Sequence, residues 1–195
     1  MNRAPLRAVL RVSLMSAFAL LPSAAASDGL FAQLDASRTT TTGVLSVERG
    51  NLSYATSLSG YTGGADLNAS LTYEFVLGEA APVTFRIGPA FQYEGLATPK
   101  FGVRVIAEHY RPTTFGHVFL LGEFTSIDTG YFGLLTVGFK EPDIDFEFTV
   151  QGDDDGYFDQ SIAATYGLPN NATRLRLGYR FQSREVFAGV SFNTF

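Results

Sequence analysis

Three arginines near the end of the chain fall on one side of a predicted strand. Arg174, Arg176 and Arg180 occupy even positions, while the odd positions between and after them carry Leu, Tyr and Phe. Alternation of polar and apolar residues with a period of two is typical of a β-strand. Because side chains two apart on a strand lie about 6.6 Å apart, the sequence predicts a cationic track along one wall.

Acidic side chains offer these arginines a second role. The alternation along other predicted strands places carboxylates on the same polar face. The residues that we expect to line the interior are Arg86, Arg104, Glu108, Glu123, Glu147, Arg174, Arg176 and Arg180, with Glu74, Asp145 and Glu185 as further inward acids. Because buried cations are normally paired with anions, we favour an interior filled by salt bridges over an open cationic track. The open track stays as the alternative.

Catalytic chemistry finds little support in the sequence. The chain has two histidines, His109 and His117, which the alternation places on opposite faces, and it has no Gly-x-Ser-x-Gly motif. Cysteine is absent, so neither a disulfide nor a thiolate metal site can form. We therefore predict no catalytic residue, no metal site and no cofactor.

One loop concentrates acidic residues. Asp153, Asp154 and Asp155 stand between Gly152 and Gly156. Carboxylate oxygens suit hard cations such as Ca²⁺, so this loop could bind a divalent ion or contact lipopolysaccharide through one. The loop lacks the ligand spacing of an EF-hand, and we favour a solvated hairpin loop.

The first 26 residues are predicted to be a secretory signal peptide and not part of the fold. Arg3, Arg7 and Arg11 precede an apolar segment at 12–21, which small residues follow. Without these three arginines the 14 basic residues become 11, against 19 acidic ones, so the net charge becomes −8. Such an acidic chain argues against a nucleic-acid partner. Residues 27–195 are predicted to form one domain.

The elements that would carry these side chains are predicted to be strands throughout that domain. Alternation is clearest in Leu67–Leu77 and weakest in Leu30–Ser37. Strands recur about every fourteen residues, and the ten or so residues of each match the ~9–11 that a tilted strand needs to cross a bilayer. Turns this short exclude parallel crossovers, so the sheet should be antiparallel.

A meander of this many strands is expected to close, because open edges in lipid would leave unpaired backbone groups that cost several kcal/mol each. We predict an all-β, closed, antiparallel up-and-down transmembrane β-barrel of twelve strands, or of ten if the segments before Leu52 do not both pair. A soluble barrel with its apolar side chains inside is the alternative. Against it, Lys100 and Lys140 are the only lysines in the chain, and the polar face is rich in small residues.

The last residues resemble the terminal strand of bacterial outer-membrane β-barrels, since alternation from Val186 to Phe192 is followed by a final Phe195. In that family a closing aromatic residue is part of the signal read by the insertion machinery, a role that the resemblance assigns to Phe192 and Phe195. Phe192 and Phe195 are three residues apart, whereas the aromatic residues near the end of proteins in that family are two residues apart. We therefore expect either a bulge at 193–194 or a Phe195 that lies beyond the regular strand.

This resemblance implies a location in the bacterial outer membrane, with membrane lipid, lipopolysaccharide and the barrel-assembly machinery as partners. If the C-terminus is periplasmic, as in the family, the turns at 61–64, 94–99, 128–130, 152–156 and 182–184 face outside. The number of strands and the inward arginines are also similar in pattern to the outer-membrane porins that are specific for acidic oligosaccharides.

Three functions follow as hypotheses from the sequence. We favour a non-enzymatic structural or interaction role, with at most a narrow polar lumen. The alternative is a channel for small acidic solutes or oligosaccharides that uses Arg174, Arg176 and Arg180. A lipid-modifying enzyme of the outer membrane is the second alternative.

Overall fold

The computed structural model describes residues 28–79, 81–169 and 172–195, so the predicted signal peptide at 1–26 lies outside the described residues. The described residues form the strands β1 (Gly29–Ala36), β2 (Thr40–Arg49), β3 (Leu52–Tyr61), β4 (Gly64–Leu77), β5 (Val83–Glu94), β6 (Thr98–Pro112), β7 (Gly116–Thr125), β8 (Tyr131–Phe139), β9 (Ile144–Gly152), β10 (Phe158–Gly167), β11 (Thr173–Arg180) and β12 (Glu185–Asn193). Within these residues, no helix has the length and hydrophobicity that a membrane-spanning helix needs.

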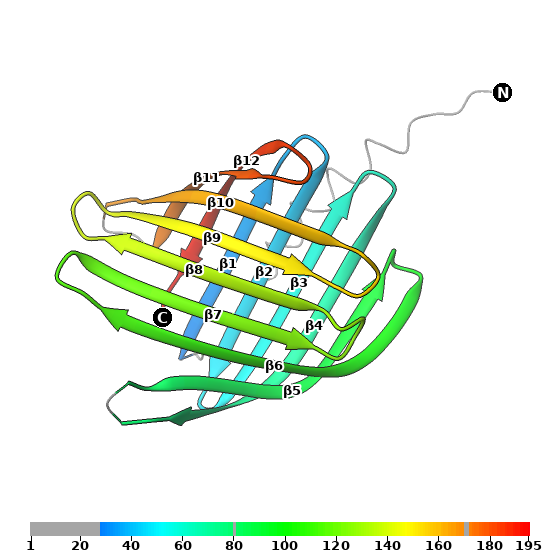
Figure 1. The fold of residues 1–195 in the computed structure, drawn as a ribbon, viewed down its shortest axis with the longest axis horizontal. Helices are drawn as coiled ribbons and strands as arrows, with labels where there is room; N and C mark the ends of the chain where they lie inside the picture. The colour runs from blue at the N-terminus through cyan, green and yellow to red at the C-terminus, as the bar shows by residue number, and fades with distance from the viewer. Residues whose placement is uncertain (1–27, 80, 170–171) are drawn as a thin grey trace.

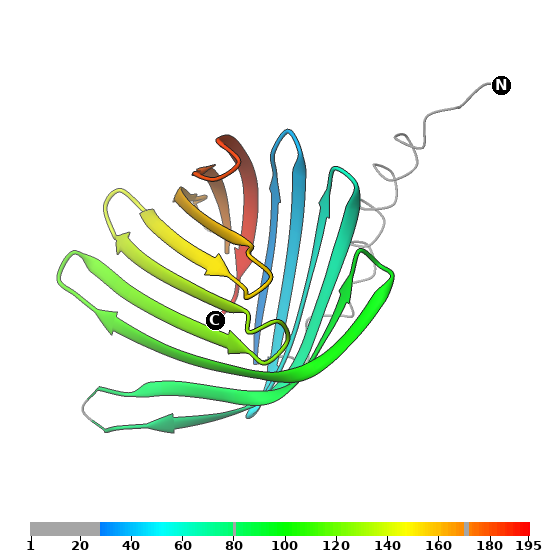
Figure 2. The same ribbon diagram turned by 45° about the vertical axis from the view of Figure 1, so that its right-hand side comes forward.

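The strands form one closed barrel. In Figure 1 and Figure 2, β1–β4 make the wall behind and β6–β9 the wall in front. Each strand pairs antiparallel with the next, and β12 returns to β1, from Phe31 opposite Asn193 to Ala36 opposite Ala188. The predicted closed up-and-down barrel is confirmed. The described chain has twelve strands and not ten, because the weak first segment pairs on both of its sides.

The two ends of the barrel are defined by the chain. β1 begins and β12 stops at one end, here called the terminal end, which also holds the turns that follow even-numbered strands. The turns that follow odd-numbered strands lie at the opposite end, here called the far end. The turns predicted to face outside all belong to the far end.

Apolar side chains cover the outer face of the barrel. Phe101, Val186 and Leu177 are 78%, 62% and 60% exposed. Aromatic rings gather in two bands. Near the terminal end, neighbouring rings among Phe75, Phe85, Phe115, Phe139 and Phe146 have centroids 5.4–6.1 Å apart. Near the far end, the corresponding residues are Phe91, Tyr93, Phe101, Tyr179 and Phe181. An apolar belt between two aromatic bands is typical of barrels that cross a bilayer.

Polar and small side chains line the interior. Thr72 and Thr165 are almost fully buried, and Asp35, Arg176 and Glu185 are buried charged residues. A soluble barrel has the opposite arrangement, with its apolar side chains packed inside.

The regular strand β12 ends before Phe195, although Thr194 still donates a backbone hydrogen bond to Leu30 of β1. This strand ends at Asn193, and the Phe195 N–H donates to Asn193 Oδ1 at 2.9 Å. The Phe195 ring packs where a side chain at Gly29 would lie. Phe195 is therefore beyond the regular strand, which was one of the two arrangements expected from its spacing. The role of Phe192 and Phe195 in assembly stays a prediction.

Candidate functional site in the barrel lumen

The residues predicted to line the interior lie on the inner wall of the barrel. Cross-strand partners share one face of a sheet, so a row of partners follows one wall. One such row runs from Glu74 through Arg86 and Ile106 to Glu123. Strand alternation and the contacts below place the remaining predicted residues on the same wall, namely Arg104, Glu108, Glu147, Arg174, Arg176 and Arg180.

Arg86 on β5 lies among three carboxylates. Its Nη2 is 2.5 Å from Glu48 Oε1 and 2.9 Å from Glu74 Oε2, and its Nη1 is 2.6 Å from Glu108 Oε1. These acids come from β2, β4 and β6. One guanidinium carries a single positive charge, so this group of four residues, called the Arg86 network, carries excess negative charge when its carboxylates are ionised.

Arg176 on β11 binds two carboxylates. Its Nε donates to Asp35 Oδ1 at 3.0 Å, and its Nη1 donates to Glu147 Oε1 and Oε2 at 2.7 and 2.9 Å. Asp35 belongs to β1 and Glu147 to β9, so this Arg176 network connects strands on both sides of β11. The side chains of Arg176 and Asp35 are each only 7% exposed.

Arg104 and Arg174 also have carboxylate partners. Arg104 on β6 contacts Glu123 on β7. Arg174 Nη2 lies 2.8 Å from Asp143 Oδ1 and 3.1 Å from Asp145 Oδ2. Arg86, Arg104, Arg174 and Arg176 therefore lie within separate ion-pair groups.

Lys100 near the far end was not among the predicted lumen residues. Its Nζ lies 2.8 Å from Glu94 Oε2 and 2.6 Å from Asp128 Oδ2. Parity, meaning whether a residue has an even or an odd number along its strand, could have placed Lys100 on the inner face, because Lys100 and Arg104 both occupy even positions of β6. Parity could not reveal Asp128, which lies in a turn. Glu48 was also missed, although it shares a strand face with other polar residues of β2.

The predicted cationic track is divided in the structure. Arg174 and Arg176 have separate acidic partners. The Arg180 Cζ atom lies 5.3 Å from the centroid of the Phe187 ring on β12. Within residues 28–79, 81–169 and 172–195, Arg180 has no carboxylate at salt-bridge distance. The three guanidinium groups do not form one continuous anion-binding surface.

Carboxylates outnumber the cations that they surround. In the described chain, the five cations Arg86, Lys100, Arg104, Arg174 and Arg176 contact ten carboxylates within 3.1 Å. In the Arg86 network, the side chains of Glu48 and Glu74 are 20% and 25% exposed, against 12% for Arg86. Water in the lumen therefore meets carboxylates before it meets the guanidinium.

Hydroxyl side chains line the inner face of β2, β3 and β4. This hydroxyl wall consists of Thr40, Thr42, Ser46, Ser57, Ser59 and Ser70. The hydroxyl oxygens of Thr42 and Ser59 lie 3.3 Å apart, and Arg104 Nη1 donates to Ser70 Oγ at 3.0 Å. All six side chains face inward yet stay partly exposed. Packing therefore does not fill the interior along this wall.

The acidic loop lies at the far end, in the turn between β9 and β10. Asp153 and Asp154 accept hydrogen bonds from neighbouring turn residues. Carboxylate oxygens of Asp154, Asp155 and Asp128 lie within 4.8 Å of one another, a spacing that could hold a divalent cation. The Lys100 ammonium already contacts Asp128, which supplies positive charge at this position. Contact of this loop with lipopolysaccharide stays a prediction.

The two histidines are far from forming a catalytic group. His117 faces the lumen, stacks on Tyr110 at 5.4 Å between centroids, and lies 4.0 Å from Asp145. The His109 ring nitrogen lies 2.8 Å from the Pro82 carbonyl oxygen. Among the described residues, neither ring contacts a serine hydroxyl, so this geometry gives no support to a serine hydrolase.

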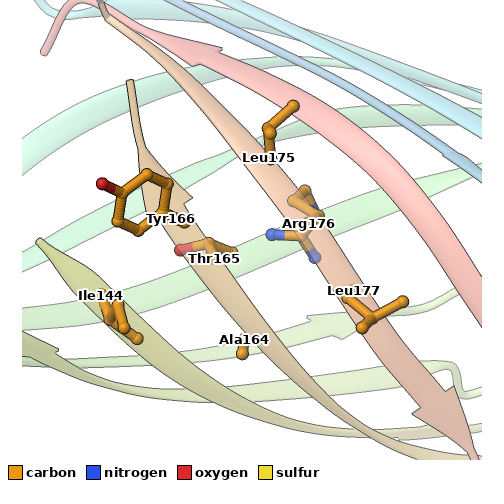
Figure 3. A pocket seen from close by; sticks show the side chains of 7 residues that line it. All are labelled: Ile144, Ala164, Thr165, Tyr166, Leu175, Arg176 and Leu177. Carbon is orange, nitrogen blue, oxygen red and sulfur yellow. The ribbon is translucent and has the colours of Figure 1, made fainter. Parts of the chain in front are cut away.

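The outer wall carries an apolar hollow of about 220 Å³ over β9, β10 and β11 (Figure 3). Ile144, Tyr166, Leu175 and Leu177 surround it, and the small side chain of Ala164 lies between them. These residues belong to the outward face of their strands. Thr165 and Arg176, which belong to the inner face, also contribute to its lining.

The barrel is similar to solved porin structures. KdgM porin aligns with a TM-score of 0.58 and 13% sequence identity over 86% of this chain and 99% of that chain. A triple mutant of Rhodopseudomonas blastica porin aligns with a TM-score of 0.42 and 11% identity over 80% of this chain and 56% of that chain. No family model and no curated protein matches the sequence. The fold is that of a small porin-like β-barrel.

Proposed function

We propose that this protein is a passive channel of the bacterial outer membrane that lets small hydrophilic solutes cross through its lumen. One observation carries the proposal: a polar, partly exposed inner wall is enclosed by a barrel whose outer face is apolar between two aromatic bands. The fold that this chain shares with KdgM porin supports the same function.

The strands that the salt bridges join support a channel. They argue against the purely structural role that we favoured from the sequence. In a ring of twelve strands, opposite walls are six strands apart. Among the described residues, salt bridges between strands join strands at most three positions apart, as Arg86 on β5 and Glu48 on β2 do. They therefore follow the wall and do not cross the lumen. Together with the exposed hydroxyl wall, this leaves room for water.

The proposed location rests on the porin-like fold, the two aromatic bands and the predicted signal peptide. Outer-membrane lipid, lipopolysaccharide and the assembly machinery are the partners that such a location implies. A membrane-fractionation experiment should place the protein with outer-membrane markers.

Neutral solutes test the channel independently of charge. The purified, detergent-folded protein should make phosphatidylcholine liposomes swell in neutral pentoses and hexoses, with rates that fall as the sugar becomes larger. Heat-unfolded protein at the same concentration is the control. Folded barrel that causes no swelling would refute the channel and restore the structural role.

Incubation with phospholipid should yield no cleavage product, whereas an enzyme would yield one.

A further inference from the structure

We propose that the lumen selects cations, and that small inorganic and organic cations cross it in preference to anions. This inference rests on the proposed channel and specifies the charge of its solute. It departs from the acidic solutes expected from the arginines, because those arginines are surrounded by a larger number of carboxylates.

The charge of the inner wall carries the inference. Five lumen cations contact ten carboxylates in the described residues. Two more acids, Asp66 and Asp159, occupy inward positions and accept hydrogen bonds without a described cation partner. Arg180 is the one inner arginine without a described carboxylate partner. Acids therefore exceed bases on the inner wall.

Exposure strengthens this charge difference. Glu48, Glu74 and Glu108 are 20%, 25% and 16% exposed, and each is more exposed than the Arg86 side chain that they surround, at 12%. In the Arg176 network, Glu147 is also more exposed than Arg176. At Arg86 and Arg176 a solute therefore approaches carboxylate oxygens first, whereas Arg104 and Arg174 are more exposed than their partners Glu123 and Asp145.

The acid-rich groups are distributed along the channel axis. Lys100 and its two acids lie near the far end, whereas Arg86 with Glu48 and Glu108 lies nearer the terminal end. A solute meets excess negative charge from either side. Low-dielectric walls concentrate this field within a narrow lumen, and inward carboxylates are the feature that gives other channels cation selectivity.

The test is the reversal potential of the full protein in planar bilayers of phosphatidylcholine, a lipid without net charge, under a tenfold KCl gradient. We expect potassium to permeate more readily than chloride by roughly threefold or more. The variant Glu48→Gln with Glu108→Gln keeps the Arg86–Glu74 pair and removes two negative charges from the lumen. Its permeability ratio should fall at least about twofold.

The matched control is Glu79→Gln with Glu141→Gln, which makes the same change in charge at two turns of the terminal end. This control should keep the selectivity, because charges in exposed turns are screened by salt. If the lumen variant does not fold, the wild-type reversal potential alone decides the proposal. Conducting channels that prefer chloride would overturn cation selectivity and leave the channel intact. Folded protein that neither conducts nor swells liposomes would overturn both.

Discussion

Arg86 and Arg176 each place a guanidinium on the inner wall, but their surroundings differ in charge and exposure. Arg86 contacts three carboxylates and is 12% exposed, whereas Arg176 contacts two and is 7% exposed. The Arg86 network lies within β2 to β6. The Arg176 network reaches Asp35 on β1 across β12, and so it spans the β1–β12 pair where the barrel closes.

This difference separates two uses of the same side chain. The buried Arg176 compensates acids that would otherwise repel each other at the closing strands, so its main contribution is to stability. The Arg86 network leaves acids uncompensated and open to the lumen, so its main contribution is to the electric field that a solute meets. Variants of the two networks should separate these contributions, and the largest effect is expected at Arg176.

Removal of the buried arginine should destabilise the barrel most. Arg176→Met leaves the buried Asp35 and the partly buried Glu147 without a cation, and loss of one partner of a buried pair typically costs about 3–5 kcal/mol. The free energy of unfolding of the protein in phospholipid vesicles, measured by urea titration, reports this loss.

The control for Arg176→Met removes all three charges at once. The triple variant Arg176→Met, Asp35→Asn, Glu147→Gln should recover most of the lost stability, because no uncompensated charge remains. Equal destabilisation in the single and triple variants would show that Arg176 acts through packing alone. The division between the two networks would then lose its electrostatic basis.

A glycine beside the Arg176 network should give the next largest effect. A Cβ at Gly189 on β12 would overlap Asp35 Oδ1 and the Leu34 carbonyl oxygen. Gly189→Ala should therefore cost about 1–3 kcal/mol, the usual range for overpacking. Gly122→Ala is the matched control, because nothing lies within 4 Å of the corresponding Cβ position. Equal unfolding free energies for the two variants would contradict the tight closure seen here.

The sequence predicted the wall of the barrel better than its ion pairs. Alternation determines which side chains face inward along a strand, so residues such as Arg86 and Glu147 could be placed from their parity alone. The pairing of Arg176 with Asp35 joins residues 141 positions apart and depends on how the twelve strands are offset when the barrel closes. No local pattern contains that offset.

The same limit explains the expected cationic track. Arg174, Arg176 and Arg180 share a strand face, as predicted, but their partners come from turns and strands that the local pattern cannot place. Alternation could have placed Lys100 on the inner face, but it could not reveal its partner Asp128, which belongs to a turn. The sign of the lumen charge therefore became visible only with the register of the whole barrel.

Acidification should reduce the cation preference that excess lumen carboxylates give. Carboxyl groups have unperturbed pKa values near 4 and arginine stays protonated, so a change from pH 7 to pH 4 makes the net charge of the lumen less negative. Protonation of lumen carboxylates should therefore lower the potassium to chloride permeability ratio at least about twofold. The reversal potential measured at both pH values reports the change.

The variant that lacks two of these acids provides the control for acidification. Glu48→Gln with Glu108→Gln should respond less to the change of pH, since fewer lumen carboxylates remain to be protonated. A wild-type reversal potential that is the same at pH 7 and pH 4 would exclude ionised carboxylates as the source of selectivity.

The smallest effect is expected at Arg180, which belongs to neither network. Its guanidinium lies over the Phe187 ring near the far end, and its removal leaves no described carboxylate without a partner. Arg180→Ala should therefore change the unfolding free energy by no more than about 2 kcal/mol, because the Phe187 ring is buried but the guanidinium is partly exposed. The loss of one positive charge should raise potassium preference slightly. A fall in that preference, measured by reversal potential, would mean that Arg180 orders nearby acids instead of opposing their field.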